Sequence, residues 1–100
     1  MPSVTIVYWR DIPAQVIVGK GRAAAKLPLP ERFEQAIDRC AMKVGAKDDE
    51  AYLAEWRRVV EAEVEGDPSD IARVYADRLD ADYDTDRLKR LIAGDGVEAA

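Results

Sequence analysis

The opening of the chain constrains the fold most, because residues 4–10 carry apolar side chains on both sides of one predicted strand. Successive side chains of a strand point to opposite faces. One face carries Val4, Ile6 and Tyr8, and the other carries Thr5, Val7 and Trp9. β-Branched and aromatic residues favour this extended conformation. Such a strand needs apolar cover on both faces, from the rest of the chain or from another molecule.

A second strand is predicted at residues 16–18, so that the two form an antiparallel hairpin. We expect the chain to reverse at residues 11–14, because Pro13 has no amide hydrogen for a ladder and biases Ile12 toward extended geometry. A two-stranded hairpin is marginal by itself in water. It must therefore pack on elements further along the chain, and its edges are predicted to remain open.

The rest of the chain has the pattern of helices. The first begins at Pro30 or Glu31 and stops before Gly45, and the second runs from Asp48 or Asp49 to Val64. The third begins at Asp67 and Pro68 and ends near Ala81 or Asp82. The last runs from about Thr85 to Gly94. Proline at a helix start and glycine beyond its end are typical boundaries. The alanine run at residues 23–25 predicts a short helical turn.

Apolar residues three and four positions apart give the predicted helices one buried stripe each. In the second helix the stripe consists of Leu53, Trp56, Val60 and Val64. In the third it consists of Ile71, Val74, Tyr75 and Leu79. Cys40 lies on the stripe of the first helix, so we expect it to be a core thiol.

These elements predict an α+β fold, in which the N-terminal antiparallel β-hairpin packs on three to four helices and can be extended by another chain. A chain of 100 residues can bury one hydrophobic core. We predict a single domain over residues 1–94 and a disordered tail over residues 95–100. The apolar fraction of 48% excludes a disordered chain.

The residue types exclude several kinds of chemistry. Histidine is absent, which removes the commonest general base and metal ligand. Cys40 is the only cysteine, so no disulfide forms within the chain, and the count suits the reducing cytoplasm. The five aspartates between residues 77 and 86 lack the ligand order of an EF-hand. We therefore predict no catalytic residue, no metal and no cofactor.

The net charge of −5 is unevenly distributed. Residues 1–47 carry eight Lys or Arg against four Asp or Glu, giving +4, and residues 48–100 carry seven against sixteen, giving −9. The two halves can complement each other within the molecule. An acidic chain is a poor ligand for nucleic acid. No apolar run approaches the length that spans a bilayer, so we expect no membrane partner.

Two glycines alternate with Lys20 and Arg22 at residues 19–22. One interpretation is an anion or phosphate grip, formed by the two cations and exposed backbone amides. The loop lacks the spacing of a P-loop or of a dinucleotide fingerprint. The other interpretation is a tight exit from the strand, for which glycine supplies the backbone freedom. In the expected hairpin, Arg10 and Asp11 lie at the opposite end from this loop.

Several segments resemble a bacterial family named "virulence factor". They are VYWRDIPAQV at residues 7–16, GKGR at 19–22, LPERFEQAID at 29–38 and AYLAEWR at 51–57. The resemblance implies an accessory or scaffolding role. Longer relatives carry an iron-sulfur-scaffold-like domain and HEAT-type repeats, and free-standing relatives accompany folate- or corrinoid-dependent methyl-transfer proteins. The family supplies no catalytic motif that could be transferred to this chain.

We therefore expect a non-catalytic, cytoplasmic protein-interaction domain whose partner is another protein or a second copy. The predicted binding residues are Trp9, Arg10, Asp11, Lys20 and Arg22. The alternative is a small anion-binding or catalytic domain that uses the basic loop at residues 19–22. A redox or iron-sulfur role for Cys40 would require a partner or oligomer, because one thiol cannot hold a cluster that takes four ligands.

Overall fold

The computed structural model describes residues 3–45 and 49–97, and within them the chain forms one four-stranded antiparallel sheet with the strand order β3-β2-β1-β4. The strands are β1 (Ser3–Trp9), β2 (Ile12–Val18), β3 (Ala25–Pro28) and β4 (Trp56–Glu63). The helices are α1 (Glu31–Lys43), α2 (Asp49–Ala54), α3 (Pro68–Asp82) and α4 (Thr85–Ala93), with a 3-10 turn η1 (Gly21–Ala23). The α+β prediction is confirmed.

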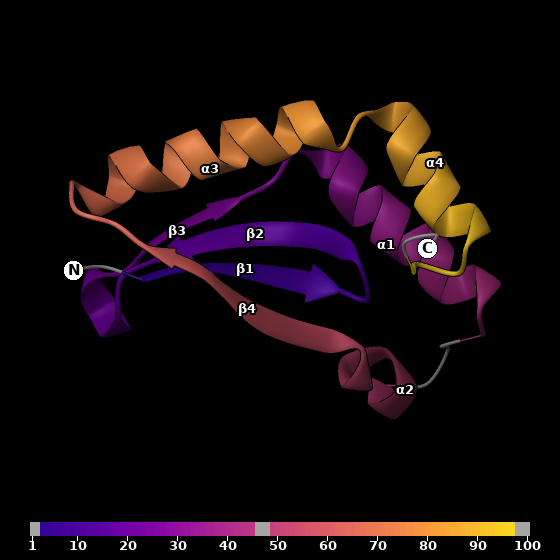
Figure 1. Cartoon of the computed structure of the whole chain (residues 1–100). Helices are drawn as coiled ribbons and strands as arrows, with labels where there is room; N and C mark the ends of the chain where they lie inside the picture. Colours follow the sequence, from indigo (N-terminus) through magenta and orange to yellow (C-terminus); the bar gives the residue numbers. More distant parts are fainter. Residues whose placement is uncertain (1–2, 46–48, 98–100) are drawn as a thin grey trace.

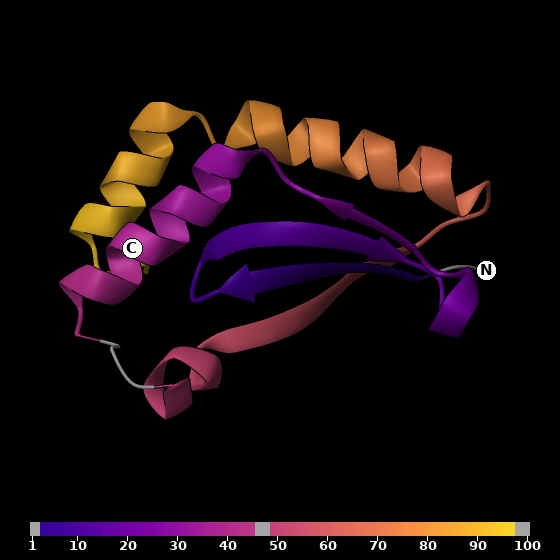
Figure 2. The same cartoon turned by 180° about the vertical axis from the view of Figure 1, so that it is seen from behind.

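The helices are unequally distributed around the sheet (Figures 1 and 2). Helix α3 lies along one face and contacts β2 and β3, while α1 and α4 pack side by side beyond the end where β1 turns into β2. The short α2 lies on the opposite side of the sheet from α3, next to the start of β4 (Figure 1). Among the described residues, no helix combines the length and apolar character required to cross a bilayer.

The predicted hairpin is confirmed, but its turn lies earlier than expected. Trp9 pairs with Ile12, so Arg10 and Asp11 alone form the loop, and Arg10 adopts a left-handed φ of 55°. Pro13 belongs to β2 instead of the turn. It is tolerated there because β3 pairs with β2 only from Gln15 onward, and the register with β1 shifts between Val7 and Tyr8, next to Pro13.

The predicted helical turn at residues 23–25 is wrong, because the 3-10 turn η1 comes earlier and Ala25 already begins β3. Gly19 has a φ of 98°, which only glycine adopts easily, and its amide donates to the Ser3 carbonyl at 3.0 Å. This geometry returns the chain alongside β2. Hydrogen bonding to the unpaired edge of β2 then stabilises the strand conformation more than the intrinsic helix preference of alanine stabilises a helical turn.

The predicted helix that ends at Val64 is also wrong. Only α2 is helical, and β4 follows it and pairs with the free edge of β1. The start proposed at Asp48 lies outside the described residues. The register shifts where Val4 pairs with Ala62 and Thr5 pairs with Val60, which leaves one extra residue in β4. The bulge puts Ala62 on the same face as Val59, which a strict alternation would not do. The apolar residues Trp56, Val60 and Val64 are spaced four apart in the sequence and so imitate a helical stripe.

The other predicted helices are confirmed. Helix α3 is capped by the Asp67 carboxylate, which accepts from the Asp70 amide at 3.2 Å, and Asp84 caps α4 in the same way. The predicted burial of Val74 is wrong, since its side chain is 53% exposed. The contact face of α3 is rotated toward Ala72 and Ala76, whose small side chains let the helix approach the sheet closely.

Trp9 is the largest fully buried side chain. It occupies the turn end of the sheet, where α1 and α2 close over the face that α3 leaves open. Its indole Nε1 donates to the Tyr52 carbonyl at 3.0 Å, and the Trp9 and Tyr52 rings are 5.8 Å apart. Cys40 belongs to the same core cluster, which confirms the expected core thiol.

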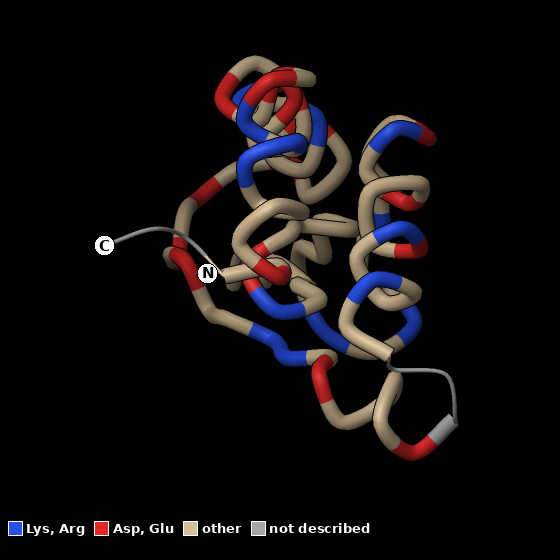
Figure 3. The backbone as a smooth tube through the Cα atoms, turned by 90° about the vertical axis from the view of Figure 1, so that its right-hand side faces the viewer, with Lys and Arg blue, Asp and Glu red and all other residues tan. Residues whose placement is uncertain are grey.

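The unequal halves of the chain do complement each other. Three ion pairs join a cation of the basic first half to a carboxylate of the acidic second half, and a fourth joins a carboxylate of the first half to an arginine of the second. The pairs are Arg10 with Glu55, Arg32 with Asp80, Lys43 with Asp95, and Asp11 with Arg57. Along the helices, positions of cationic and acidic residues alternate (Figure 3). Exposed pairs of this kind each contribute at most about 1 kcal/mol.

Asp95 and Gly96, which the sequence analysis assigns to a tail, contact the hairpin turn. The Asp11 amide donates to the Gly96 carbonyl at 2.8 Å, and the Arg10 guanidinium donates to the Asp95 carbonyl at 2.5 Å. The remainder of the predicted tail, residues 98–100, lies outside the described residues.

We predict that Trp9→Ala lowers the free energy of unfolding by about 3 to 5 kcal/mol, because it leaves a large cavity and removes the partner of the Tyr52 carbonyl. Guanidinium unfolding followed by circular dichroism measures this loss. Val74→Ala, at an exposed position, should change stability by less than about 1 kcal/mol. A loss below about 1 kcal/mol for Trp9→Ala would contradict the anchoring role.

Candidate functional site

The face of the sheet turned away from α3 is the candidate site. Paired strand residues share a face, so the register places Val7, Gln15 and Arg58 in one row across β1, β2 and β4. The next row contains Thr5, Ile17, Lys26 and Val60. Val7 and Ile17 are buried by their neighbours within this face, yet neither belongs to the main core cluster. These two rows therefore mix apolar and polar side chains, and α1 and α2 cover this face only at the turn end of the sheet.

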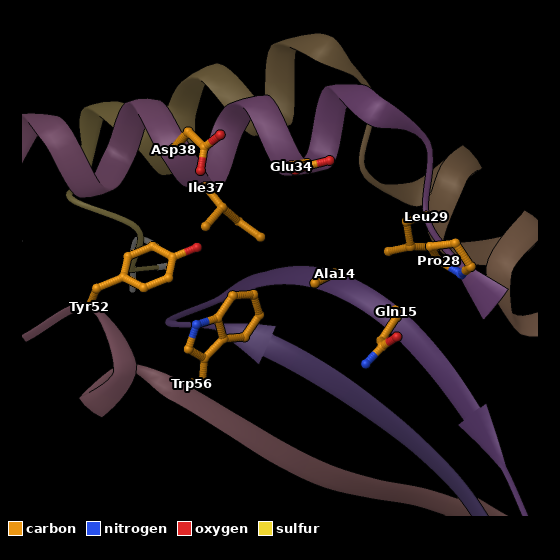
Figure 4. A pocket seen from close by; sticks show the side chains of 9 residues that line it. All are labelled: Ala14, Gln15, Pro28, Leu29, Glu34, Ile37, Asp38, Tyr52 and Trp56. Atoms are coloured by element: carbon orange, nitrogen blue, oxygen red, sulfur yellow. The ribbon is translucent and has the colours of Figure 1, made fainter. Parts of the chain in front are cut away.

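Two adjoining hollows cross this face, and they share Gln15 and Trp56. We call them together the open-face groove. The first is a cavity of about 280 Å³ between α1, α2 and the sheet. It is lined by Ala14, Gln15, Pro28, Leu29, Glu34, Ile37, Asp38, Tyr52 and Trp56 (Figure 4). The second is lined by Val7, Gln15, Trp56, Arg57 and Arg58.

The first cavity combines aromatic rings with carboxylates. The rings of Tyr52 and Trp56 meet edge to face with centroids 5.9 Å apart. Figure 4 shows Asp38 on α1 pointing toward Tyr52, and Glu34 one turn away on the same helix with its side chain directed away from the two rings. The spacing of four residues puts both carboxylates on the same side of α1. One helix therefore supplies negative charge above an aromatic and apolar floor.

These carboxylates interact electrostatically with the Tyr52 hydroxyl. Burial raises the pKa of Tyr52 above its ordinary value, and the negative charges of Asp38 and Glu34 raise it further. Neither carboxylate takes part in an ion pair among residues 3–45 and 49–97. Both carboxylates are exposed and have no ion-pair partner within those residues, so they place negative charge at the rim of the first cavity.

The second hollow has the opposite charge. Arg58 lies beside Val7 on the open face and is exposed. Arg57 points toward the other face, where its guanidinium contacts the Asp11 carboxylate at 2.8 Å and lies 4.9 Å from the centre of the Tyr8 ring. The open-face groove therefore runs from an acidic, aromatic end to a basic end at Arg58.

Two exposed apolar side chains lie on elements that form the groove. Leu53 on α2 is 62% exposed, and Val60 on β4 is 66% exposed. Both were expected in a buried helical stripe. The strand conformation of β4 instead puts Val60 on the open face, in the row that follows Arg58. The groove and these side chains offer apolar contacts, aromatic faces and charges of both signs, which is the chemistry of binding another molecule.

The five binding residues predicted from the sequence do not form one site. Arg10 and Asp11 lie at the hairpin turn, whereas Lys20 and Arg22 are exposed at the far end of a strand that spans roughly 20 Å. Trp9 is fully buried and has no surface with which to contact a partner. Arg10 and Asp11 each face a charged partner within the chain.

The predicted docking of a strand along an open hairpin edge is wrong, because β3 and β4 occupy both edges of the hairpin. The sequence analysis missed the groove residues Glu34, Asp38, Tyr52 and Trp56 as a group. They come together only because β4 is a strand, which brings Trp56 below α1. A β-branched and aromatic run at residues 56–60 was the available signal for that strand.

Cys40 is enclosed. Burial raises the pKa of the Cys40 thiol, and a Cβ placed on Gly96 would lie only 3.0 Å from its sulfur. Within the described residues, no three His, Cys, Asp or Glu side chains are gathered closely enough to hold a metal ion.

The described residues define a small two-layer α+β domain with an open sheet face. The chain belongs to the family described as "Virulence factor", whose model matches residues 7–92. This match runs from the middle of β1 almost to the end of α4 and includes every residue of the open-face groove. No curated protein matches the chain, and no solved structure matches it.

We predict that native protein reacts far more slowly with a thiol reagent such as DTNB at pH 8 than denatured protein does, because the Cys40 thiol is buried and its pKa is raised. The variant Val74→Cys in a Cys40→Ser background supplies an exposed thiol as control and should react at once. Equal reaction rates of Cys40 and the control thiol would contradict the enclosed position.

We predict that Glu34→Gln with Asp38→Asn lowers the pKa of Tyr52 relative to the parent protein, while burial keeps it above its ordinary value. A pH titration of the Tyr52 ring by NMR measures the change. Because the pKa is raised in the folded protein, Tyr52 contributes stability that is complete below about pH 10 and lost as pH rises through the folded pKa.

The control for this titration is Glu65→Gln with Asp77→Asn, which changes the net charge equally at exposed positions outside the groove. The control should leave the pKa of Tyr52 unchanged. An unchanged pKa in the Glu34 and Asp38 variant would remove the evidence that these carboxylates act on the cavity.

Proposed function

We propose that this protein is a non-catalytic accessory or scaffolding protein that binds another protein through the open-face groove. The observation that carries the proposal is the sheet face opposite α3, which is hollowed and which α1 and α2 cover only at the turn end, leaving Val60 exposed. Exposed apolar surface on a soluble domain is characteristic of an interaction site.

The composition of the groove supports a protein as partner. Aromatic side chains and arginine are enriched in protein interfaces, and the groove contains Tyr52, Trp56 and Arg58. Val60, exposed on the same face of the sheet, adds apolar surface. A groove that crosses three strands is better suited to an extended segment than to a compact small molecule.

The face is a better docking surface than the sheet edges. β3 has only four residues, and β4 carries a bulge and several charged side chains. Short, bulged and charged edge strands resist the addition of another strand. Binding through side chains on the open face leaves the sheet unchanged.

The family description associates the chain with virulence. For the partner, the resemblance described above suggests one-carbon or methyl-transfer proteins, or proteins related to iron-sulfur assembly. We propose that the interaction takes place in the bacterial cytoplasm, where the single thiol Cys40 remains reduced.

The test uses photo-cross-linking from two exposed valines on opposite sides of the molecule. p-Benzoylphenylalanine replaces Val60 on the open face or, as control, Val74 on α3. We expect Val60, but not Val74, to cross-link a defined protein in host cells. Arg58→Glu should abolish the cross-link, whereas Arg73→Glu on α3 should preserve it, and both variants should keep the parent melting temperature.

Two results would contradict the proposal. Equal cross-linking from Val60 and Val74, or none from either, would show that the open face has no specific partner. A cross-link from Val60 to a second copy of this chain would show that the open face mediates self-association instead of binding a different protein.

A further inference from the structure

We propose that the acidic, aromatic cavity of the open-face groove receives a lysine or arginine side chain from an extended segment of the partner protein. The inference rests on the proposed function and specifies the chemistry that the partner must present. Its basis is the combination of Tyr52 and Trp56 with the carboxylates of Glu34 and Asp38 in one cavity.

The aromatic rings suit the cationic head group. A lysine ammonium or arginine guanidinium is attracted to the face of a tryptophan or tyrosine ring, most strongly where water is partly excluded. The protein uses this contact several times in its own structure, as where the Arg57 guanidinium lies 4.9 Å from the centre of the Tyr8 ring. The apolar floor of the cavity, including Ile37 and Leu29, suits the methylene stem of a long basic side chain.

The carboxylates suit the positive charge. Some carboxylates of the described surface, such as Glu55 and Asp80, are paired with arginines of the same chain, whereas exposed ones such as Glu65 have no ion pair within the described residues. Glu34 and Asp38 have no such partner within the described residues, although they lie on the same side of one helix. Burial raises the pKa of Tyr52, and the negative charges of Asp38 and Glu34 raise it further, which agrees with carboxylates placed close to the ring.

The size and shape of the cavity favour a side chain of a larger partner. Its volume of about 280 Å³ is at the lower limit of cavities that enclose a whole small molecule. The cavity continues past Gln15 and Trp56 into the second hollow. A segment that places its basic residue in the cavity can therefore extend across Val7, and an acidic residue in the same segment would meet Arg58.

The experiment is a selection from a phage-displayed library of random dodecapeptides on the intact protein. We expect the selected peptides to share a lysine or arginine at one position. Isothermal titration calorimetry then measures the dissociation constants of the strongest peptide and of the same peptide with alanine in place of the shared basic residue. Both peptides are titrated into the parent protein and into the double variant Glu34→Gln, Asp38→Asn. Each change should weaken binding at least tenfold, which corresponds to about 1.4 kcal/mol.

The two losses should not add, because each removes the same contact. The charge-matched control Glu65→Gln, Asp77→Asn should bind the peptide within about twofold of the parent protein, a difference too small for loss of such a contact. Chemical shift changes at the Trp56 indole and the Tyr52 ring on peptide addition place the peptide in the cavity.

Three outcomes would overturn the inference. Peptides that bind at Trp56 without a shared basic residue would leave the proposed function intact and refute only the basic side chain. Self-association of the parent protein that Glu34→Gln, Asp38→Asn abolishes would assign the cavity to a second copy. If no peptide binds and Val60 yields no cross-link, the proposed function fails as well.

Discussion

The pairing of β4 with β1 is the constraint on which the rest of the structure depends. It converts an N-terminal hairpin into a four-stranded sheet, because β1 then has a neighbour on each side. It also places Trp56 beside Trp9 at the turn end of the sheet. Without this pairing, α2 would have no fixed position over Trp9, and the cavity below α1 would have no second aromatic wall.

Local patterns predicted those elements whose conformation is determined by nearby residues. Asp67 and Pro68 specify the start of α3 through a cap and a fixed φ, and the apolar stripe of α1 predicts its buried face. The failures occurred where a distant partner decides the conformation. Ala25 and Val60 adopt strand geometry because β2 and β1 present unpaired edges to them, and no local window contains that information.

The same reasoning explains the candidate site. The basic loop and the hairpin turn stood out in the sequence because their charges are clustered locally. The groove is assembled from α1, β2, α2 and β4, so its residues are scattered over the chain and each has an ordinary role when taken alone. Glu34 and Asp38 have the pattern of a solvated helix face. Only the tertiary structure reveals that this face borders a cavity.

The long separation between the two central partners has a consequence for synthesis. Thr5 and Val60 are neighbours in the sheet, although 54 residues lie between them in the chain. A ribosome releases β1 and β2 well before β4, so the nascent hairpin has a bare edge until residue 63 has emerged. During that interval the nascent chain exposes an apolar hairpin with an unpaired edge, which other nascent chains could pair with. Rapid synthesis of the segment up to β4 therefore limits misassembly.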